Sequence, residues 1–342
     1  MNKIAFVISS SEVGGAQTWV RDQIEILCES GVETFVITNK AGWLTETTSA
    51  KVYYIPELDK KISILGIWKL ARIIKKETIT TLVASSANAG VFSRIAALKS
   101  STRCIYVSHG WSCIYNGGYL KKIFCSIECI LSKITYKILC VSSSDYANAR
   151  DIIGIKENKL QLIVNGIDNK SLNIKDGKRK NSTSLKLLSV GRINHPKRFD
   201  LLVESIKNMD NVELYIVGSG PLISDIPNQS NVHLLGEIPS FSSYSDFDVF
   251  CLISDSEGLP MSALEAACSG LPLVLSDVGG CSDVINKTFK NGLLVENTTD
   301  DIVSAINDIQ LNYAEYLDNA LKVINVHALN NKAENYFELY FN

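Results

Sequence analysis

Short runs of β-branched and aliphatic residues alternate with longer amphipathic stretches along almost the whole chain of 342 residues. The first series of predicted strands reads KIAFVIS, ETFVIT, TLVAS, RCIYVSH and KILCVSS, and segments 16–30 and 63–77 between them are predicted helices. The second series reads SLKLLSVG, VELYIVG, NVHLLG, DVFCLIS, LPLVLSD and GLLV. This alternation is typical of parallel βαβ units. We therefore expect an α/β protein with two Rossmann-like, doubly wound domains that face each other across a cleft.

The break between the two series marks the predicted domain boundary. The stretch DNKSLNIKDGKRKNSTS (168–184) has no apolar period, and we interpret it as a linker or surface excursion. We predict a first domain at 1–165, a second at 166–325, and a C-terminal helix at 326–342 that packs back on the first. A chain of this length suits two cores of ordinary size. Ligands of such sheets bind beyond the carboxyl ends of the strands, where this chain keeps its glycines.

Cysteines, histidines and hydropathy constrain the compartment and the metal chemistry. The nine cysteines contain no Cys-x-x-Cys pair, and the four histidines form no cluster with ligand spacing. The apolar run at the N-terminus, Ile4 to Ile8, is too short for the core of a signal peptide. No stretch approaches the roughly 20 apolar residues that a membrane helix needs. We predict a cytoplasmic protein with reduced thiols and no bound metal, and leave open peripheral contact with the inner face of a membrane.

Charge is unevenly distributed between the two halves of the chain. Residues 1–165 carry 20 Lys+Arg against 13 Asp+Glu, whereas the remainder carries 14 against 23. A basic first half either favours an anionic partner, such as a phosphate-bearing acceptor or an acidic membrane surface, or is simply solvated. No nucleic-acid partner is predicted.

Segment 119–139 has two interpretations. It carries apolar and basic residues at helical spacing, namely Ile123, Ile127, Ile130, Ile134, Lys121, Lys122, Lys133 and Lys137. An amphipathic helix of this kind can rest on an anionic membrane surface. A helix that faces the core and extends a basic rim into water explains the same residues. The stretch 60–76 is open to both interpretations as well.

The strongest chemical signal is the segment 248–280, DVFCLISDSEGLPMSALEAACSGLPLVLSDVGG. A buried strand runs into a polar glycine turn, and Pro260 suits the first position of the helix that follows. Ser262 and Glu265 have the spacing of a capping box, which also predicts a helix start here. A helix N-terminus after a glycine turn suits a pyrophosphate. Glu257 and Glu265 lie at different depths, so each carboxylate can accept hydroxyl protons from a different sugar.

At this point the sequence resembles a known family. Glu257 and Glu265 have the Glu-x7-Glu spacing of retaining glycosyltransferases of the GT-B fold, and EGLPMSALEAACSGLP resembles family 4, the glycosyl transferases of group 1. The resemblance extends over nearly the whole chain. Its further motifs are Gly14-Gly15-Ala16-Gln17, Ser108-His109-Gly110, Asn165-Gly166-Ile167-Asp168, Val190-Gly191-Arg192 with Lys197, Ile216-Val217-Gly218-Ser219-Gly220-Pro221 and Leu235-Gly236-Glu237.

Two positions depart from the family pattern. Arg198 follows Lys197 where many members have glycine, a change that leaves the diphosphate assignment intact and could narrow the donor or acceptor. In SEGLPMSALE, Ser256 precedes Glu257 where many members have an aromatic residue. The aromatic contact of those members is therefore not expected here.

The resemblance implies a role for each matched residue. Glu257 would hydrogen-bond the transferred sugar, Glu265 the ribose, and His109 would lie near the anomeric carbon. Arg192 and Lys197 would neutralise the departing diphosphate in place of a metal ion. The implied catalytic residues are His109, Glu257, Arg192 and Lys197. The implied donor-binding residues are Gly15, Arg192, Lys197, Gly218, Ser219, Glu237, Glu257, Gly258, Leu259, Pro260, Met261, Ser262 and Glu265. The implied acceptor-side residues are Gly14, Gln17 and His109.

The resemblance also implies the reaction. We expect transfer of a hexose or N-acetylhexosamine, with retention, from a nucleotide diphosphate sugar such as a UDP-sugar to a glycan or polyprenyl-linked acceptor. The setting would be the assembly of a cell-surface polysaccharide such as an O-antigen or capsule. No cofactor or metal is expected. Asp246-Phe247-Asp248 has the Asp-x-Asp form of a metal site, but it precedes a buried strand and so lies at the edge of the sheet opposite to the expected ligand edge. Two alternatives stay open: a nucleotide-sugar epimerase or phosphorylase on the same fold, and a non-catalytic partner subunit.

Overall fold

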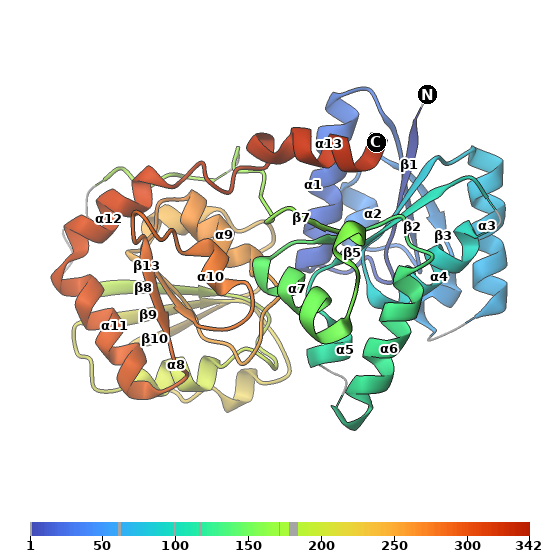
Figure 1. Cartoon of the computed structure of the whole chain (residues 1–342). Coiled ribbons are helices and arrows are strands. Elements are labelled where there is room, and N and C mark those ends of the chain that lie inside the picture. The colour runs from blue at the N-terminus through green and yellow to red at the C-terminus, as the bar shows by residue number, and fades with distance from the viewer. Residues whose placement is uncertain (1, 61–62, 99, 116–117, 171, 178–183) are drawn as a thin grey trace. The chain divides into compact units, whose positions relative to one another are not determined.

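The computed structural model describes residues 2–60, 63–98, 100–115, 118–170, 172–177 and 184–342. The chain divides into two compact units, Met1–Asn165 with Lys332–Asn342, and Gly166–Asn331 (Figure 1). Each unit is a parallel sheet flanked by helices. Both sheets have the strand sequence 3-2-1-4-5-6 of a doubly wound fold, and the first sheet has one additional strand.

The first unit contains a seven-stranded parallel sheet in the order β3-β2-β1-β4-β5-β6-β7. Its strands are β1 Lys3–Val7, β2 Glu33–Thr38, β3 Lys51–Tyr54, β4 Thr81–Ala84, β5 Arg103–Ser108, β6 Lys137–Cys140 and β7 Leu160–Leu162. The five predicted strands are confirmed. Strands β3 and β7 are not among the predicted strands; they are short, lie at the two edges of the sheet and are largely accessible to water.

Helices cover both faces of this first sheet. They are α1 Gly15–Glu29, α2 Trp43–Thr47, α3 Ile64–Glu77, α4 Ala87–Ala97, α5 Ser112–Tyr115, α6 Lys121–Ser132, α7 Ser143–Ala147 and α13 Ala333–Phe341. The two helices predicted at 16–30 and 63–77 match α1 and α3 to within one residue. The central strand serves both layers: Ala5 and Val7 belong to the apolar cluster beneath α3 and α4, whereas Phe6 contacts Trp19 of α1 and Tyr340 of α13.

The C-terminal helix α13 is part of the first unit. Tyr336 packs edge-on against Trp19, and the Tyr340 hydroxyl donates to Gln23 Oε1 at 2.8 Å, with both tyrosines fully buried. The helix begins at Ala333 and is shorter than the predicted segment 326–342. Residues 327–329 instead bond the backbone of Ile167 within the second unit.

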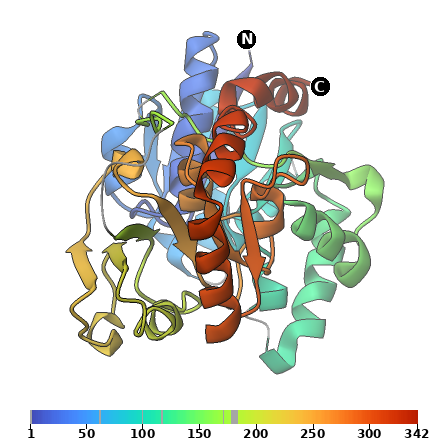
Figure 2. The ribbon, with the colours of Figure 1, turned by 90° about the vertical axis from the view of Figure 1, so that its left-hand side faces the viewer.

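The second unit contains a six-stranded parallel sheet in the order β10-β9-β8-β11-β12-β13 (Figure 2). All six predicted strands are confirmed, at β8 Leu185–Val190, β9 Val212–Val217, β10 Val232–Gly236, β11 Val249–Leu252, β12 Leu273–Ser276 and β13 Gly292–Val295. Its helices are α8 Phe199–Ser205, α9 Met261–Cys268, α10 Cys281–Val284, α11 Thr299–Leu311 and α12 Tyr313–Lys322. The fold class predicted from the alternation is therefore confirmed.

The predicted linker at 168–184 is only partly a surface excursion. Residues 171 and 178–183 lie outside the described part of the chain. Lys175, in the described part, is buried, and its ammonium group lies 3.4 Å from a carboxylate oxygen of Asp248. Asp248 in turn accepts from the Lys186 backbone N–H at 3.0 Å. The segment thus crosses back over the start of β11, and Asp248 has a structural role at the amino edge of the sheet.

The core-facing interpretation of 119–139 is wrong for its isoleucines. Within α6, the residues that point into the protein are Cys125, Glu128 and Ser132. Ile123, Ile127 and Ile130 are all exposed, as is Ile134 just beyond the helix. Among the described residues, no helix is both long and apolar enough to cross a bilayer.

Candidate functional site

Two loops of the second unit meet where β8 and β11 lie side by side. The order of the strands reverses between these two strands, and ligands of doubly wound sheets bind at this switch point. Residues 196–198 run antiparallel to 253–255, with a bridge between Lys197 and Ser254 and backbone hydrogen bonds of 2.9 Å on either side. The pairing carries Lys197 to Glu257, where the ammonium nitrogen lies 2.7 Å from the carboxylate oxygen Oε1.

The Lys197–Glu257 pair is shielded from water, with side-chain exposures of 17% and 11%. An ion pair in such surroundings is screened less than one on the open surface. The cation is a ready partner for a phosphate oxygen, and the carboxylate can accept from a sugar hydroxyl. The structure therefore brings together two residues that the family motifs assigned to the diphosphate and to the sugar.

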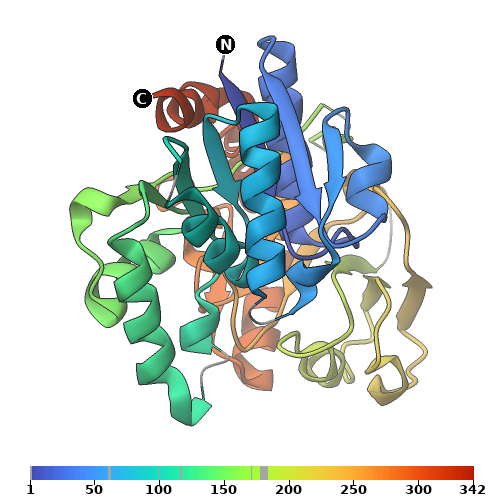
Figure 3. The same cartoon turned by 90° about the vertical axis from the view of Figure 1, so that its right-hand side faces the viewer.

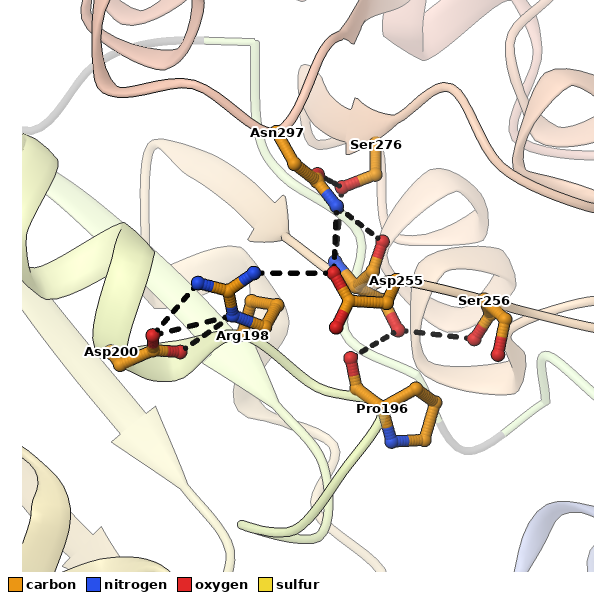
Figure 4. Close-up of polar contacts among 8 residues, drawn as sticks. Pro196, Arg198, Asp200, Asp255, Ser256, Ser276 and Asn297 are labelled. Carbon is orange, nitrogen blue, oxygen red and sulfur yellow. Dashed lines mark hydrogen bonds and ion pairs between the residues drawn. The ribbon is translucent and has the colours of Figure 1, made fainter.

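A network of side chains fixes the geometry of this loop pair (Figure 4). The Arg198 guanidinium binds the carboxylates of Asp200 at 3.0 Å and Asp255 at 3.2 Å. The hydrogen bonds to Asp200, and next those to Asp255, raise the pKa of Arg198. The hydrogen bonds from Arg198 lower the pKa of Asp200. The arginine that departs from the family pattern is thus engaged with carboxylates of the donor-domain loops.

Asn297 completes the network from the loop after β13. Its amide nitrogen donates to the Ser254 carbonyl at 3.0 Å and to the Asp255 carboxylate at 3.2 Å (Figure 4). Its amide oxygen accepts from the Ser276 hydroxyl at 2.5 Å. Asn297, Asp200 and Ser276 were not among the predicted site residues. No spacing pattern could have found them, since they come from three different segments.

Glycines allow the neighbouring loops to pack backbone against backbone. A β-carbon on Gly218, whose φ is +146°, would lie 2.0 Å from the Gly191 carbonyl oxygen. A β-carbon on Gly220 would lie 2.1 Å from the Ile193 oxygen, and the Ile193 N–H donates to Ser219 O at 2.9 Å. These contacts place the exposed Ser219 beside the loop that carries Arg192, which is itself exposed at the end of β8.

Gly279 makes the closest approach of this kind. Its φ is +52°, and a β-carbon there would lie 1.7 Å from the Glu257 carbonyl oxygen. The adjacent Gly280 N–H donates to Gly258 O at 2.8 Å. The backbone that carries Glu257 thus depends on a glycine turn more than twenty residues further along the chain.

The start of α9 differs from the sequence prediction. Pro260 occupies the N-cap position instead of the first helical position, and no side-chain cap bond is present. Ser262 lies within the first turn, so the capping box predicted for Ser262 and Glu265 is wrong. The Glu265 carboxylate instead accepts from the Tyr244 hydroxyl at 2.5 Å. A partner twenty-one residues away in the sequence has replaced the local one.

Tyr244 is a hydrogen-bond donor that was not among the predicted site residues. Its side chain is fully buried, and burial, with the nearby Glu265 carboxylate, raises its pKa well above the ordinary value. The phenol therefore keeps its proton at neutral pH and orients the Glu265 carboxylate.

The other predicted donor-binding residues differ in exposure. Between Glu257 and Glu265 in the sequence, Leu259 and Pro260 are buried, whereas Met261 and Ser262 are half-buried. Glu237 is exposed just beyond β10.

In the first unit, His109 follows β5 at the carboxyl edge of the sheet. Its Nε2 lies 2.7 Å from the Ser85 hydroxyl, and its ring packs edge-on against Trp19 at 5.2 Å between centroids. Part of the ring is accessible, but the surrounding protein desolvates it and lowers its pKa to about 4. The imidazole is therefore neutral at pH 7.

The glycine loop after β1 reaches the same edge of the first sheet. Gly14 is the N-cap of α1, and Gly15 is the exposed first residue of that helix. Gln17 donates to the Ser10 carbonyl at 3.0 Å, which fixes the loop. Because β1, β4 and β5 are neighbours in this sheet, the loop and His109 belong to one ligand edge.

Within the residues that the structure describes, no three His, Cys, Asp or Glu side chains are placed to hold a metal ion. The carboxylate of Asp248, part of the Asp-x-Asp sequence, is already bonded to Lys186 and Lys175. Metal independence stays a prediction.

Comparison with known proteins identifies the family. The family model described as "Glycosyltransferase Family 4" matches residues 13–171, and the model "Glycosyl transferases group 1" matches residues 184–312. The chain is 44% identical over 343 residues to the O-antigen biosynthesis glycosyltransferase WbnH of Escherichia coli, and the match covers 98% of both chains. The chain belongs to glycosyltransferase family 4.

Two further proteins extend the comparison of this family 4 glycosyltransferase. It is 26% identical to the UDP-Gal:alpha-D-GlcNAc-diphosphoundecaprenol alpha-1,3-galactosyltransferase of E. coli over 337 residues, covering 89% of this chain and 87% of the relative. Its structure superposes on the crystal structure of Anabaena HepE in complex with UDP and glucose with a TM-score of 0.82. That match has 15% identity and covers 99% of each chain. The glycosyltransferase therefore has the GT-B fold.

Proposed function

We propose that this glycosyltransferase transfers a hexose or N-acetylhexosamine from a UDP-sugar to a glycan linked to a polyprenyl carrier. The Lys197–Glu257 pair at the switch point of the second unit carries the proposal, because it offers a cation for the diphosphate beside a carboxylate for the sugar. HepE was crystallised with UDP and glucose, and the galactosyltransferase relative is named for a UDP-sugar and a diphosphoundecaprenol-linked acceptor. WbnH is named for O-antigen biosynthesis, so we place this protein in cell-surface polysaccharide assembly at the cytoplasmic side of the membrane.

The proposed reaction retains the configuration of the anomeric carbon. The bond between that carbon and the diphosphate oxygen breaks, and the electron pair leaves with UDP. The acceptor hydroxyl oxygen forms the new bond on the same face, and its proton passes to the departing phosphate oxygen. Lys197 and Arg192 would stabilise the charge that develops on the diphosphate. This chemistry needs no metal ion.

The remaining residues would bind and orient the substrates. Glu257 would accept from hydroxyls of the sugar, and Glu265, held by Tyr244, from the ribose. A neutral His109, with Ser85 on its Nε2, can exchange hydrogen bonds with the sugar but adds no positive charge at pH 7. We assign it orientation of the sugar, with Gly14 and Gln17 on the acceptor side.

The test uses the full chain, a set of isotope-labelled UDP-sugars and synthetic polyprenyl diphosphate-linked sugars. We expect a product with the anomeric configuration of the donor, detected by NMR, and full activity in EDTA. An inverted product would overturn retention, and activity restored only by manganese would overturn metal independence. Epimerised free donor without transfer would identify an epimerase. Release of a sugar 1-phosphate from a glycan by inorganic phosphate, without any nucleotide, would identify a phosphorylase. Failure to bind any nucleotide diphosphate would indicate a non-catalytic subunit.

A further inference from the structure

Helix α6 has its polarity reversed relative to a helix that covers a water-soluble core. Its inward positions carry a thiol, a carboxylate and a hydroxyl, from Cys125, Glu128 and Ser132. The opposite side carries Ile123 and Ile130, whose side chains are 57% and 62% exposed, together with Ile127 and, one turn further on, Ile134. These isoleucines have the spacing i, i+4, i+7, i+11, so they form one continuous stripe, here termed the isoleucine stripe.

The inward side of α6 is held by an ion pair. The Glu128 carboxylate lies 2.7 Å from a guanidinium nitrogen of Arg94 on α4, and Arg94 is completely buried. The guanidinium carbon in turn lies 4.0 Å above the ring of Tyr106. Removing Glu128 from this site would leave a buried cation without its carboxylate, so the orientation of the helix is strongly specified. The outward position of the isoleucine stripe is therefore a fixed feature of the fold.

A second apolar patch lies on α3, in the same helical layer. Ile64, Leu65 and Trp68 are exposed in its first turns, and Ile64 is 83% exposed. The inward side of α3 is packed normally, with Leu70 and Ile74 buried in the core cluster. The exposed residues Ile64, Leu65 and Trp68 therefore do not belong to the apolar core of the first unit.

Both apolar surfaces begin at the ligand edge of the first sheet. Helix α3 follows β3, and α6 follows β5 through α5, so each helix starts beyond the carboxyl end of its parallel strand. Figure 3 shows α3 and α6 in front of the sheet, with their first turns toward the same end. A flat surface that touched both helix starts would therefore lie beside the edge that carries His109 and the glycine loop.

The exposed charged side chains of segments 63–77 and 119–139 are positive, and the acidic Asp151 beside α6 is paired with Arg150. Lys122 and Lys133 are exposed on α6, and Lys75 and Lys76 on α3, while Arg72 lies 4.7 Å from the Trp68 ring. The acidic side chains of segments 63–77 and 119–139 are Glu77 and Glu128. Both are buried and bonded, Glu77 to Lys51 and Tyr53, and Glu128 to Arg94. The combination of exposed isoleucines, an exposed tryptophan and lysines matches what binds an anionic lipid surface.

We propose that the isoleucine stripe of α6 and the first turns of α3 dock this protein onto a bilayer that contains anionic phospholipid. A second copy of the chain fits the surface less well, because a twofold contact through it would bring the lysines of both copies together. Anionic headgroups would neutralise the same lysines while the isoleucines enter the interface. This goes beyond the proposed reaction and does not depend on it.

The experiment measures co-sedimentation of the full chain with vesicles of phosphatidylcholine alone or mixed with phosphatidylglycerol. We expect binding to the mixed vesicles that weakens with added salt, and little binding to phosphatidylcholine. The double variant I123Q/I130Q should bind the mixed vesicles about tenfold less tightly, since two apolar side chains leave the interface. The double variant K122Q/K133Q should lose the preference for phosphatidylglycerol. The matched control L311Q changes an 84% exposed leucine at the end of α11 and should bind like the wild type.

Several outcomes would overturn the proposal. Wild-type protein that stays in the supernatant with both vesicles would do so, as would equal binding by wild type and I123Q/I130Q. A dimer seen by light scattering that I123Q/I130Q converts to monomer would assign the face to a second copy instead. Circular dichroism and UDP calorimetry on every variant separate lost docking from lost folding or lost donor binding. If I123Q/I130Q does not fold, K122Q/K133Q provides the test. Binding of this variant to mixed vesicles as tightly as the wild type would overturn the proposal.

Discussion

Lys197 Nζ lies 2.7 Å from Glu257 Oε1, and this contact joins the loop after β8 to the loop after β11. The two residues are sixty positions apart in the sequence and reach each other through the short antiparallel pairing of 196–198 with 253–255. Without a ligand the cation and the carboxylate neutralise each other. In the proposed function, a diphosphate would compete with Glu257 for Lys197, and Glu257 would then become available to a sugar hydroxyl.

Substitutions of Lys197 and of Glu257 should have opposite or unequal effects on the affinity for UDP. Lys197→Ala removes the cation and leaves a partly buried carboxylate facing the diphosphate, so UDP should bind about tenfold to a hundredfold more weakly. Glu257→Ala releases Lys197, so UDP affinity should be unchanged or higher while turnover falls about a hundredfold. Calorimetry with UDP and steady-state transfer assays measure the two effects. Equal weakening of UDP binding in both variants would contradict the competition.

Tyr244→Phe tests how Glu265 is oriented. The variant removes the buried hydroxyl that donates to the Glu265 carboxylate, and we expect a loss of about 1–3 kcal/mol in the free energy of unfolding. UDP should bind more weakly, because the carboxylate no longer has a fixed direction. The comparison with 2′-deoxy-UDP is decisive: the wild type should prefer the ribonucleotide more strongly than the variant does. An unchanged preference would remove Glu265 from its role at the ribose.

His109 should titrate far below an ordinary histidine. Its pKa in the folded protein is about 4, below the usual 6.5, because burial disfavours the charged ring. Above pH 6.5 the ring is neutral in both folded and unfolded chains, so it adds no pH dependence to stability. Between pH 6.5 and 4 only the unfolded chain binds the proton, and this site should lower stability by up to about 1.4 kcal/mol per pH unit.

Two measurements examine that titration. NMR of the imidazole ring should place the midpoint near pH 4, and His109→Gln should flatten the fall of stability between pH 6.5 and 4. Transfer activity should show no inflection from this residue above pH 6. A midpoint near 6.5 would mean that the ring is solvated and available as a cation.

Asn297→Ala should loosen the loop pair without touching a ligand. Its amide bonds the backbone carbonyl of the buried Ser254 and the exposed side chain of Asp255, and the variant leaves the Ser254 carbonyl without that donor. We expect a loss of about 1–3 kcal/mol in stability and weaker UDP binding through misplacement of Lys197. Asn312→Ala is the control, since its amide bonds Asp308 at the end of α11. Equal UDP affinity in the Asn297 variant and the wild type would show that the network only supports the fold.

Gly279→Ala should be much more damaging than Gly31→Ala. Both glycines have positive φ, +52° and +74°, so both substitutions strain the backbone by about 1 kcal/mol. A β-carbon at Gly279 would also overlap the Glu257 carbonyl, whereas the one at Gly31 would have no atom within 4 Å. Thermal unfolding should show Gly31→Ala near the wild type and Gly279→Ala severely destabilised or insoluble. Similar melting temperatures for both would show that the Glu257 turn can move away at little cost.

The sequence was a good guide to the local structure and to the order of the motifs. Eleven of the strands are runs rich in aliphatic residues, most of them buried, whose composition favours β structure directly, and glycines at their ends predicted the ligand loops. The edge strands β3 and β7 were not predicted; they have only four and three residues, most of them accessible to water. The capping box at Ser262 and Glu265 fitted the local pattern, but the Tyr244 hydroxyl bonds Glu265 from outside the helix.

By itself, the sequence determined the α/β class, the two strand series, and which residue types stand at the ends of which strands, because these depend on neighbours in the chain. Only the tertiary structure decided which charges pair. Lys197 meets Glu257 and Asp255 meets Arg198 because a nonlocal backbone bridge aligns two loops. The direction of α6 was also decided at that level. Its amphipathic pattern fits either orientation, and the ion pair between Glu128 and the buried Arg94 of another helix turns the isoleucines outward.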